Sequence, residues 1–383
     1  MKDVRQGTNR TIHWNIDSSS CSKVHPEAYG ITANTGNRFL GDKLVIFYTF
    51  GKLPYCNRRQ RLMGVAKKGG YKCHTPVDGG VPQAANFTAH FAQMEADINE
   101  RMPNVSFDGL AVVDYEAWVP VWELNTWYRV AYQHLSEDLV KKNCSGCSQE
   151  KITRRAHEEF DEGAKTFLLK TLAHAKKLRP NAKWGFWQQP LCDKKVGYTN
   201  FSECTERYQQ VNKKLMYLFE ASDVLYPKIY FYDRRSEEGK RQFHVYGQLQ
   251  QALKINKALR NSSKLIYAYG KFEYNATWNE ATQQMEERFY SEEDLCNTLK
   301  YTYELGVDGV ILWGSSGHMS ARCDLFESYL KKSLGPMAKA VVEEAETCAT
   351  KKCKGKGRCV AADPRPPSKC QLGKERPMHC VPY

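Results

Sequence analysis

The chain has 383 residues, of which 42% are apolar, and its 56 Lys and Arg exceed its 43 Asp and Glu. This length and apolar content allow one large core or two smaller ones, and no run approaches the roughly 18 apolar residues that a membrane-spanning helix requires. The formal charge of +13 favours a polyanionic partner: nucleic acid, an anionic membrane surface or an acidic polysaccharide. A basic surface that is merely solvated explains the same charge equally well.

Short apolar runs alternate with helical patterns along most of the chain. We expect seven strands, at residues 11–15, 43–50, 110–116, 183–187, 224–230, 264–269 and 307–313. Helical patterns occur at residues 89–101, 118–140, 152–178, 206–221, 247–258, 292–305 and 331–345. Such alternation predicts an α/β fold, a distorted TIM-like (β/α) barrel, over an open doubly wound sheet. No glycine-rich phosphate-binding motif follows a strand, so nucleotide chemistry has no support.

The composition changes after residue 345. Residues 346–383 contain five cysteines, many Lys and Pro, and almost no apolar periodicity, so we expect a barrel domain at 1–345 and a small disulfide-rich tail at 346–383. The spacing resembles the opening of an EGF-like module at Cys348, Cys353 and Cys359. The later half departs from that pattern, because no Cys-x-Cys follows Cys370. With five cysteines, one must pair outside the tail or stay free.

Cysteines and glycosylation motifs both indicate an oxidising compartment. The fourteen cysteines include one Cys-x-x-Cys, at 144–147, with no second pair or His at zinc spacing, so disulfides are favoured and no metal site is expected. That motif forms either a local bridge or two separate bridges. The first residues lack a hydrophobic signal core, so we expect a secreted or lysosomal protein whose targeting segment is absent here. Predicted N-glycosylation sites are Asn9, Asn86, Asn104, Asn143, Asn200, Asn261 and Asn275.

One predicted strand ends in two acids. An apolar run at 110–113 leads into Asp114, Tyr115 and Glu116. In an extended strand the two acids share one face and Tyr115 takes the other, at the strand end where barrel enzymes carry their chemistry. Two carboxyls this close do not both ionise easily, so we expect one to keep its proton and act as a general acid. Helix capping, or pairing with a surface Lys, is the competing interpretation.

The sequence around these acids resembles the active-site segment of the hyaluronidase family of glycoside hydrolases. Residues 107–127 read FDGLAVVDYEAWVPVWELNTW, and further motifs of the family follow in the same order over about residues 11–338: IHWN at 12–15, GGVPQ at 79–83, YPKIY at 226–230 and GVILWGSS at 309–316. A chitinase is the near competitor, because Asp108-Gly109-Leu110 precedes the acids. Its motif needs a further Asp where Ala111 and Val112 stand, and the spacing is one residue too long.

The resemblance implies an endo-hydrolase that cuts β-1,4 bonds between N-acetylhexosamine and glucuronate, in hyaluronan or chondroitin. Glu116 is the implied proton donor. The substrate's own N-acetyl carbonyl is the implied nucleophile, which gives net retention, and Asp114 holds the acetamido group. No metal or organic cofactor is implied. A non-catalytic glycosaminoglycan-binding protein on the same fold is the alternative.

The resemblance also implies which residues contact the sugar. They are Tyr230, Trp313, Trp187, Tyr115, Ser315 and Ser316, for which ordinary barrel packing or a turn is the competing interpretation. Trp187 stands where the family commonly has a Tyr, and a Trp has no phenolic hydroxyl to offer. This departure predicts either a shift toward chondroitin or reduced activity. Asn275 is a second departure, near a position where many members have Asp.

Several cysteines are expected to form disulfides. The resemblance implies Cys21 with Cys323 and Cys192 with Cys204, and it marks Cys348 and Cys359 as disulfide cysteines; Cys56 with Cys73 is a further candidate pair. The pairing of Cys144, Cys147, Cys296, Cys353, Cys370 and Cys380 is left open.

Basic residues after residue 230 could attract a polyanionic substrate to the site, although a solvated loop is the competing interpretation. The candidates are Arg234, Arg235, Lys240 and Arg241.

Overall fold

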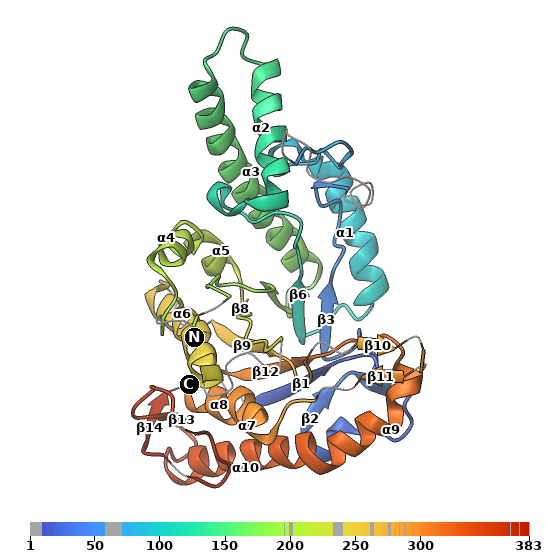
Figure 1. Ribbon diagram of the computed structural model, residues 1–383, viewed down its shortest axis with the longest axis vertical. Helices are drawn as coiled ribbons and strands as arrows, with labels where there is room; N and C mark the ends of the chain where they lie inside the picture. Colours follow the sequence, from blue (N-terminus) through green and yellow to red (C-terminus); the bar gives the residue numbers. More distant parts are fainter. Residues whose placement is uncertain are drawn as a thin grey trace. The chain divides into compact units, whose positions relative to one another are not determined.

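The computed structural model describes residues 10–57, 71–194, 196–198, 202–232, 240–260, 264–274, 277–279, 281–282, 284–286, 289–367, 369–374 and 376–382. The chain forms two compact units (Figure 1). The first comprises Met1–Val45, Trp187–Asn212 and Asp223–Tyr383, and the second comprises Ile46–Phe186 and Lys213–Ser222. Helix α10, Gly335–Lys351, runs through the domain boundary expected at residue 345, and that division stays a prediction.

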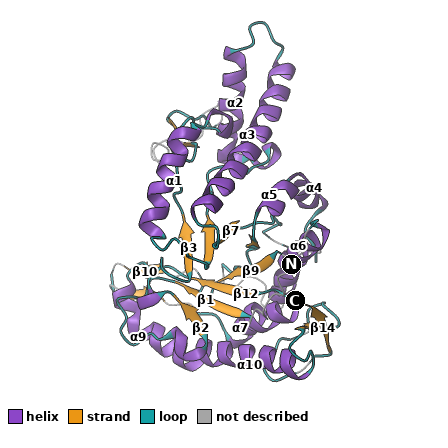
Figure 2. Cartoon of the chain, turned by 180° about the vertical axis from the view of Figure 1, so that it is seen from behind, coloured by secondary structure: helices purple, strands orange, loops and turns teal. Residues whose placement is uncertain are grey.

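The first unit contains a five-stranded sheet in the order β2-β1-β12-β9-β8. Every neighbouring pair is parallel, and the strands are almost wholly buried, as continuous apolar runs in a helix-covered parallel sheet should be. Helices α9 and α10 run along the β1–β2 side of this sheet in Figure 2. The strands are β1 Thr11–Asn15, β2 Ile31–Ala33, β8 Val224–Leu225, β9 Leu265–Gly270 and β12 Gly309–Trp313.

The second unit is built on a three-stranded sheet in the order β3-β6-β7. Its strands are β3 Leu44–Phe47, β6 Leu110–Val113 and β7 Lys183–Phe186. Its main helices are α1 Phe87–Arg101, α2 Val130–Lys142 and α3 Gln149–Leu178. Helices α2 and α3 lie side by side as an antiparallel pair (Figure 1), with the Cys144–Cys147 bridge in the turn between them.

Further helices complete the chain: α4 Glu206–Lys214, α5 Met216–Ala221, α6 Arg241–Ala258, α7 Glu292–Leu295, α8 Tyr301–Glu304 and α9 Met319–Tyr329. Three small antiparallel pairs are β4 Tyr55–Cys56 with β5 Pro76–Val77, β10 Thr277–Asn279 with β11 Gln284–Glu286, and β13 Gly357–Ala361 with β14 Met378–Pro382. Among the described residues, no helix is both long and apolar enough to cross a membrane.

All seven expected strands are present, although several are shorter than predicted, and β2 was missed because it has only three residues. The helix expected at 118–140 begins only at Val130. Pro120 has no amide hydrogen, and the Asn125 side chain bonds the backbone at Val119 and Val121, which holds this segment out of a helix. The seven expected strands belong to two separate sheets, one of five strands and one of three, so barrel closure stays a prediction.

Seven disulfides join all fourteen cysteines. The pairs Cys21–Cys323, Cys192–Cys204 and Cys56–Cys73 confirm the sequence predictions. Cys348 and Cys359, predicted only as disulfide cysteines, pair with each other. The Cys-x-x-Cys motif forms the local bridge Cys144–Cys147. Within the tail Cys353 pairs with Cys380, and Cys370 is the tail cysteine that pairs outside it, with Cys296. That last bridge fastens the tail to the segment between α7 and α8.

Two buried histidines predict acid sensitivity. Burial lowers the pKa of His13 to about 4 and that of His244 to about 4. Because unfolded His binds a proton near pH 6.5, the unfolded state holds more protons between pH 6.5 and 4, and stability falls as pH drops through that window. Each of the two histidines should lower the free energy of unfolding at pH 5 by about 2 kcal/mol relative to pH 7. Urea unfolding at pH 7 and 5 measures the loss. His13→Gln should reduce it, whereas the same change at exposed His25 should not.

Candidate functional site

Both acids follow directly after β6. The strand was expected to continue to Glu116, but it ends at Val113, so the two acids belong to the loop at its carboxyl end. The Asp114 amide still donates to the Phe47 carbonyl at 2.9 Å, and its side chain is buried with 7% exposure. Glu116 is exposed. A buried carboxyl fixed by the sheet thus precedes one that is open to a ligand.

The loop after Glu116 is fixed by side chains that the sequence prediction did not single out. Arg129 donates from Nη2 to the Glu116 carbonyl at 2.8 Å and from Nε to the Ala117 carbonyl at 3.2 Å. Fully buried Asn125 accepts from the Val119 amide at 3.0 Å. Since each bond is to the main chain, these residues set the backbone that carries Glu116. The Asn in the LNTW segment was the one sequence signal for them.

Tyr115, which the resemblance implied as a sugar contact, packs within the second unit, and its contact with the sugar stays a prediction. Its hydroxyl donates to the Phe50 carbonyl at 2.5 Å, and its ring lies 6.0 Å from that of Phe167 and 5.9 Å from that of Phe186. Burial raises the pKa of this hydroxyl well above its usual value. The hydroxyl is therefore committed to the interior of the second unit.

The first unit gathers three of the predicted sugar-contacting residues. Tyr230 stacks on Trp313 with ring centroids 6.0 Å apart and planes 19° apart, and the ring of Trp187 lies 6.3 Å from that of Tyr230 at an angle of 48°. Tyr232, which is 45% exposed, meets Tyr230 edge to face at 6.0 Å. We call Trp187, Tyr230, Tyr232 and Trp313 the aromatic cluster. Its flat faces are suited to the C–H faces of a sugar ring.

Two buried lysines pack against the aromatic cluster. Lys228 is 8% exposed, and its ammonium lies 5.2 Å from the ring centre of Trp187. Lys271 is 5% exposed and lies 5.4 Å from that of Trp313. Burial lowers the pKa of Lys271, against the opposing effect of Glu273. Sequence reasoning missed both residues, although a Lys inside the otherwise apolar YPKIY strand was a usable signal.

The turn after β12 is held by a buried ion pair. Glu273 and Arg322 bind each other with almost no exposure. Glu273 also accepts from the Ser315 amide at 3.2 Å, and Arg322 donates to the Ser315 carbonyl at 2.9 Å. A Cβ at Gly314 would come within 3.2 Å of the Glu273 carboxylate, so a larger residue would crowd the pair. Ser315 and Ser316 are exposed, and Ser316 accepts from the Asp17 amide at 3.0 Å.

The predicted basic loop is only partly described. Arg234 and Arg235 lie outside the described residues, and Lys240 is exposed. The prediction for Arg241 is wrong: its side chain is 1% exposed and binds Asp294 at 2.5 Å. Arg241 begins helix α6, and its guanidinium packs against the rings of Phe231 and Tyr274. Arg241 therefore stabilises the interior of the first unit and cannot contact a polymer.

Of the predicted glycosylation sites, Asn86, Asn104 and Asn143 are exposed. The Asn86 side chain caps α1 by accepting from the Ala89 amide. The remaining sites lie outside the described residues: Asn9, Asn200, Asn261 and Asn275.

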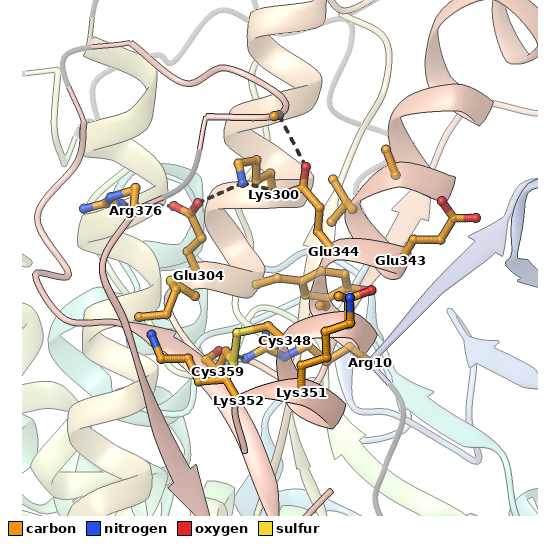
Figure 3. Close-up of a pocket in the computed structure, with 17 residues that line it drawn as sticks. Arg10, Lys300, Glu304, Glu343, Glu344, Cys348, Lys351, Lys352, Cys359 and Arg376 are labelled. Atoms are coloured by element: carbon orange, nitrogen blue, oxygen red, sulfur yellow. Dashed lines mark hydrogen bonds and ion pairs between the residues drawn. A yellow bond between two sulfur atoms is a disulfide. The ribbon is translucent and has the colours of Figure 1, made fainter. Parts of the chain in front are cut away.

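A cavity of about 500 Å³ lies in the first unit against the tail (Figure 3). Lys300 reaches Glu344 at 2.7 Å and Glu304 at 3.2 Å, and Arg376 of the tail reaches Glu304 at 3.0 Å. The Gly373 amide also donates to Glu344 at 3.3 Å. These contacts bind the tail to α8 and α10, so the lining is explained by attachment of the tail.

Two described groups of side chains converge closely enough for a metal. The first is Cys353, Cys359 and Cys380, whose sulfurs are in disulfides. The second is Glu123, His157 and Asp161, in which Lys214 already pairs with Glu123 and the His157–Asp161 distance is that of a hydrogen bond, 3.2 Å. We assign no metal to either group.

Comparison with known proteins gives the family. The profile of the family described as hyaluronidase matches residues 2–377, almost the whole chain. The chain belongs to the hyaluronidase family of glycoside hydrolases. The acids after β6, Tyr230 and Trp313 all lie in the sequence motifs that resemble this family.

Relatives and solved structures agree with this assignment. A chondroitin hydrolase of Caenorhabditis elegans is 31% identical over 364 residues, 93% of this chain and 76% of the relative. A hyaluronidase of Apis mellifera is 30% identical over 86% of this chain and 84% of its own. The crystal structure of bee venom hyaluronidase in complex with a hyaluronic acid tetramer superposes with a TM-score of 0.74 at 29% identity, covering 86% of this chain and 99% of that one. The α/β fold of the family is thereby confirmed.

Proposed function

We propose that this hyaluronidase-family chain is an endo-β-N-acetylhexosaminidase that hydrolyses β-1,4 bonds between N-acetylhexosamine and glucuronate in hyaluronan, chondroitin or both. The observation that carries the proposal is the pair of acids in the loop after β6, of which Asp114 is buried and Glu116 is exposed on a backbone that Arg129 holds. The hyaluronic acid tetramer bound by the bee venom enzyme supports the substrate class, and so does the excess of basic residues here.

In this mechanism Glu116 protonates the leaving glycosidic oxygen. The carbonyl oxygen of the substrate's own acetamido group attacks the anomeric carbon, Asp114 orients that group, and water then opens the intermediate with net retention. Exposure of Glu116 suits a group that must reach a polymer and later deprotonate water. Tyr230 and Trp313 contact the acetamido-bearing sugar, and Ser315 and Ser316 line its path.

A non-catalytic glycosaminoglycan-binding protein is the second candidate. Trp187 replaces the usual Tyr and packs against Tyr230 and Lys228, which favours a changed sugar site. The presence of both Asp114 and Glu116 favours the enzyme, because a binding protein has little need of a proton donor at this position.

We also propose a secreted or lysosomal glycoprotein whose strands close into a barrel and whose tail is EGF-like. The exposed sequons at Asn86, Asn104 and Asn143 and the paired cysteines support the route of export. The pairing of the first tail cysteine with the third, and the small antiparallel sheet β13–β14, support the EGF-like tail.

Product analysis tests the proposed function. The purified glycoprotein is incubated with hyaluronan and with unsulfated chondroitin from acid to neutral pH, and the products are measured by mass spectrometry. Even-numbered saturated oligosaccharides with N-acetylhexosamine at the reducing end are expected. Intact polymer in every reaction, from protein shown to be folded, would favour the binding protein instead.

A further inference from the structure

The tail is attached to one end of the sheet in the first unit. Arg358 of β13 binds Asp308 at 2.6 Å, and Arg10 donates to the Cys359 carbonyl at 2.6 Å. Asp308 directly precedes β12, and Arg10 directly precedes β1. Because these two strands are parallel, both contacts lie at their amino ends, whereas Trp313 of the aromatic cluster ends β12. The tail and the proposed sugar contact are therefore at opposite ends of the same strand.

Between α10 and β13 the tail carries a dense group of positive charges. Residues 351–356 read KKCKGK, with four lysines and no acid. All four lysines are exposed, and within the described part of the chain none of them forms an ion pair. We call Lys351, Lys352, Lys354 and Lys356 the basic turn. The negative end of the helix dipole accounts for the two lysines at the end of α10 but not for the two that follow it.

Other basic side chains near the tail have structural partners. Lys300 and Arg376 both bind Glu304 (Figure 3), and Arg358 binds Asp308. Attachment of the tail therefore uses these cations, and the charge of the basic turn faces solvent.

A disulfide and main-chain hydrogen bonds fix the shape of the basic turn. Cys353, inside the turn, is bound to Cys380 of β14. The Gly355 amide donates to the Ala349 carbonyl at 3.0 Å, and the Lys356 amide donates to the Cys353 carbonyl at 3.0 Å. These bonds close the segment into a compact turn, so the four ammonium groups are concentrated on a small surface. A backbone that is already fixed lowers the cost of ordering when a ligand binds.

We propose that the basic turn is a second, non-catalytic binding site for the anionic polysaccharide substrate. This inference rests on the proposed function, because the substrate class comes from it. Every disaccharide of hyaluronan or chondroitin carries a glucuronate carboxylate, and a compact group of ammonium charges attracts such a chain of regularly spaced anions. An anionic membrane fits less well, because the turn offers no apolar side chain outside its bridged cysteine to enter a bilayer.

Two sites at opposite ends of one strand predict a dependence on polymer length. A long chain that is bound at the basic turn raises the effective concentration of its other segments near Trp313. A short oligosaccharide occupies only one of the two sites at a time. The basic turn should therefore lower KM for long hyaluronan without changing kcat, and it should not affect cleavage of a hexasaccharide.

Removal of charge from the basic turn tests the second site. The turn variant combines Lys351→Gln, Lys352→Gln, Lys354→Gln and Lys356→Gln. The control variant combines Lys254→Gln, Lys257→Gln, Lys331→Gln and Lys332→Gln, at exposed lysines of the same unit. Both variants lose four positive charges, so an effect of overall charge appears in both. Thermal melting confirms that each variant folds, and binding is measured with Glu116→Gln added to each protein so that the polymer is not cut.

The turn variant should raise Kd and KM for long hyaluronan roughly 10-fold at low salt, since each exposed ion pair contributes a factor of about 1.5 to 5. The control variant should change both constants by less than about twofold, and about 0.5 M NaCl should remove the difference between the variants. Neither variant should change kcat/KM on a hyaluronan hexasaccharide.

Equal losses in the two variants, or no loss of polymer affinity in either, would overturn the second site. A matching loss on the hexasaccharide would place the basic turn in the catalytic site and would contradict the proposal as well. Turn-dependent binding to vesicles of phosphatidylserine and phosphatidylcholine, without such binding to hyaluronan or chondroitin, would show a membrane site instead. If the wild type cleaves neither polymer, the proposed hydrolysis fails separately, and the binding measurements still decide the second site.

Discussion

Glu116→Gln is expected to lower kcat by about 10²- to 10⁴-fold, the usual contribution of a general acid. The amide has nearly the shape of the carboxyl but cannot donate an acidic proton to the leaving oxygen. Because Glu116 is exposed and its backbone is held by Arg129, the variant should fold normally and bind polymer with little change. Release of new reducing ends from hyaluronan and chondroitin measures the loss, and equilibrium binding measures the retained affinity.

Glu123→Gln is the matched control for this prediction. Glu123 lies seven residues further along the same segment, is also exposed, and pairs with Lys214 and His157 on the surface. Its loss should leave kcat within about twofold, because exposed ion pairs contribute little. Cleavage by Glu116→Gln at the wild-type rate would show that another group is the proton donor.

The acid segment and the strands were predictable because their signals are local. Four consecutive apolar residues at 110–113 are typical of a strand that is covered on both faces, and the strand ends where the polar residues begin. The end of the strand was misplaced by three residues, since Asp114 keeps one hydrogen bond to the sheet although β6 has ended. Such a bond depends on Phe47, more than 60 residues earlier, and no local pattern reports it.

Side chains that act through tertiary contacts were the ones missed. Asn125 reads as a turn residue, yet it is buried and holds three backbone groups of a loop. Lys228 reads as a variable position within a motif, yet the sheet buries it among aromatic rings. Polar residues in a sequence are normally solvated, so only the fold shows which of them are enclosed. Burial gives such polar residues either a structural role or a role in binding, because a buried polar group must have a partner.

Arg241 illustrates the structural case, and its loss should be among the most damaging substitutions in the chain. The guanidinium donates to Asp294 at 2.5 Å and to the Tyr274 hydroxyl at 2.6 Å, all in the buried interior of the first unit. Burial disfavours the charged guanidinium, but the bond with Asp294 outweighs that effect and raises the pKa of Arg241. Arg241→Met leaves the Asp294 carboxylate buried without this partner and should cost about 3–5 kcal/mol of unfolding free energy. Urea unfolding at pH 7 measures the cost.

A double-mutant cycle separates the lost ion pair from lost packing. Met fills much of the space of the Arg stem, so most of the cost should come from the stranded carboxylate, and adding Asp294→Asn should recover part of it. The recovery is limited, because Asp294 also closes the capping box of α7 with Ser291 and accepts from Tyr274. Lys254→Met, at an exposed lysine, serves as the surface control and should change stability by less than about 0.5 kcal/mol. Stability unchanged by Arg241→Met, or a double variant no more stable than the single one, would show that the carboxylate finds another partner and that the ion pair does not hold α6 to α7.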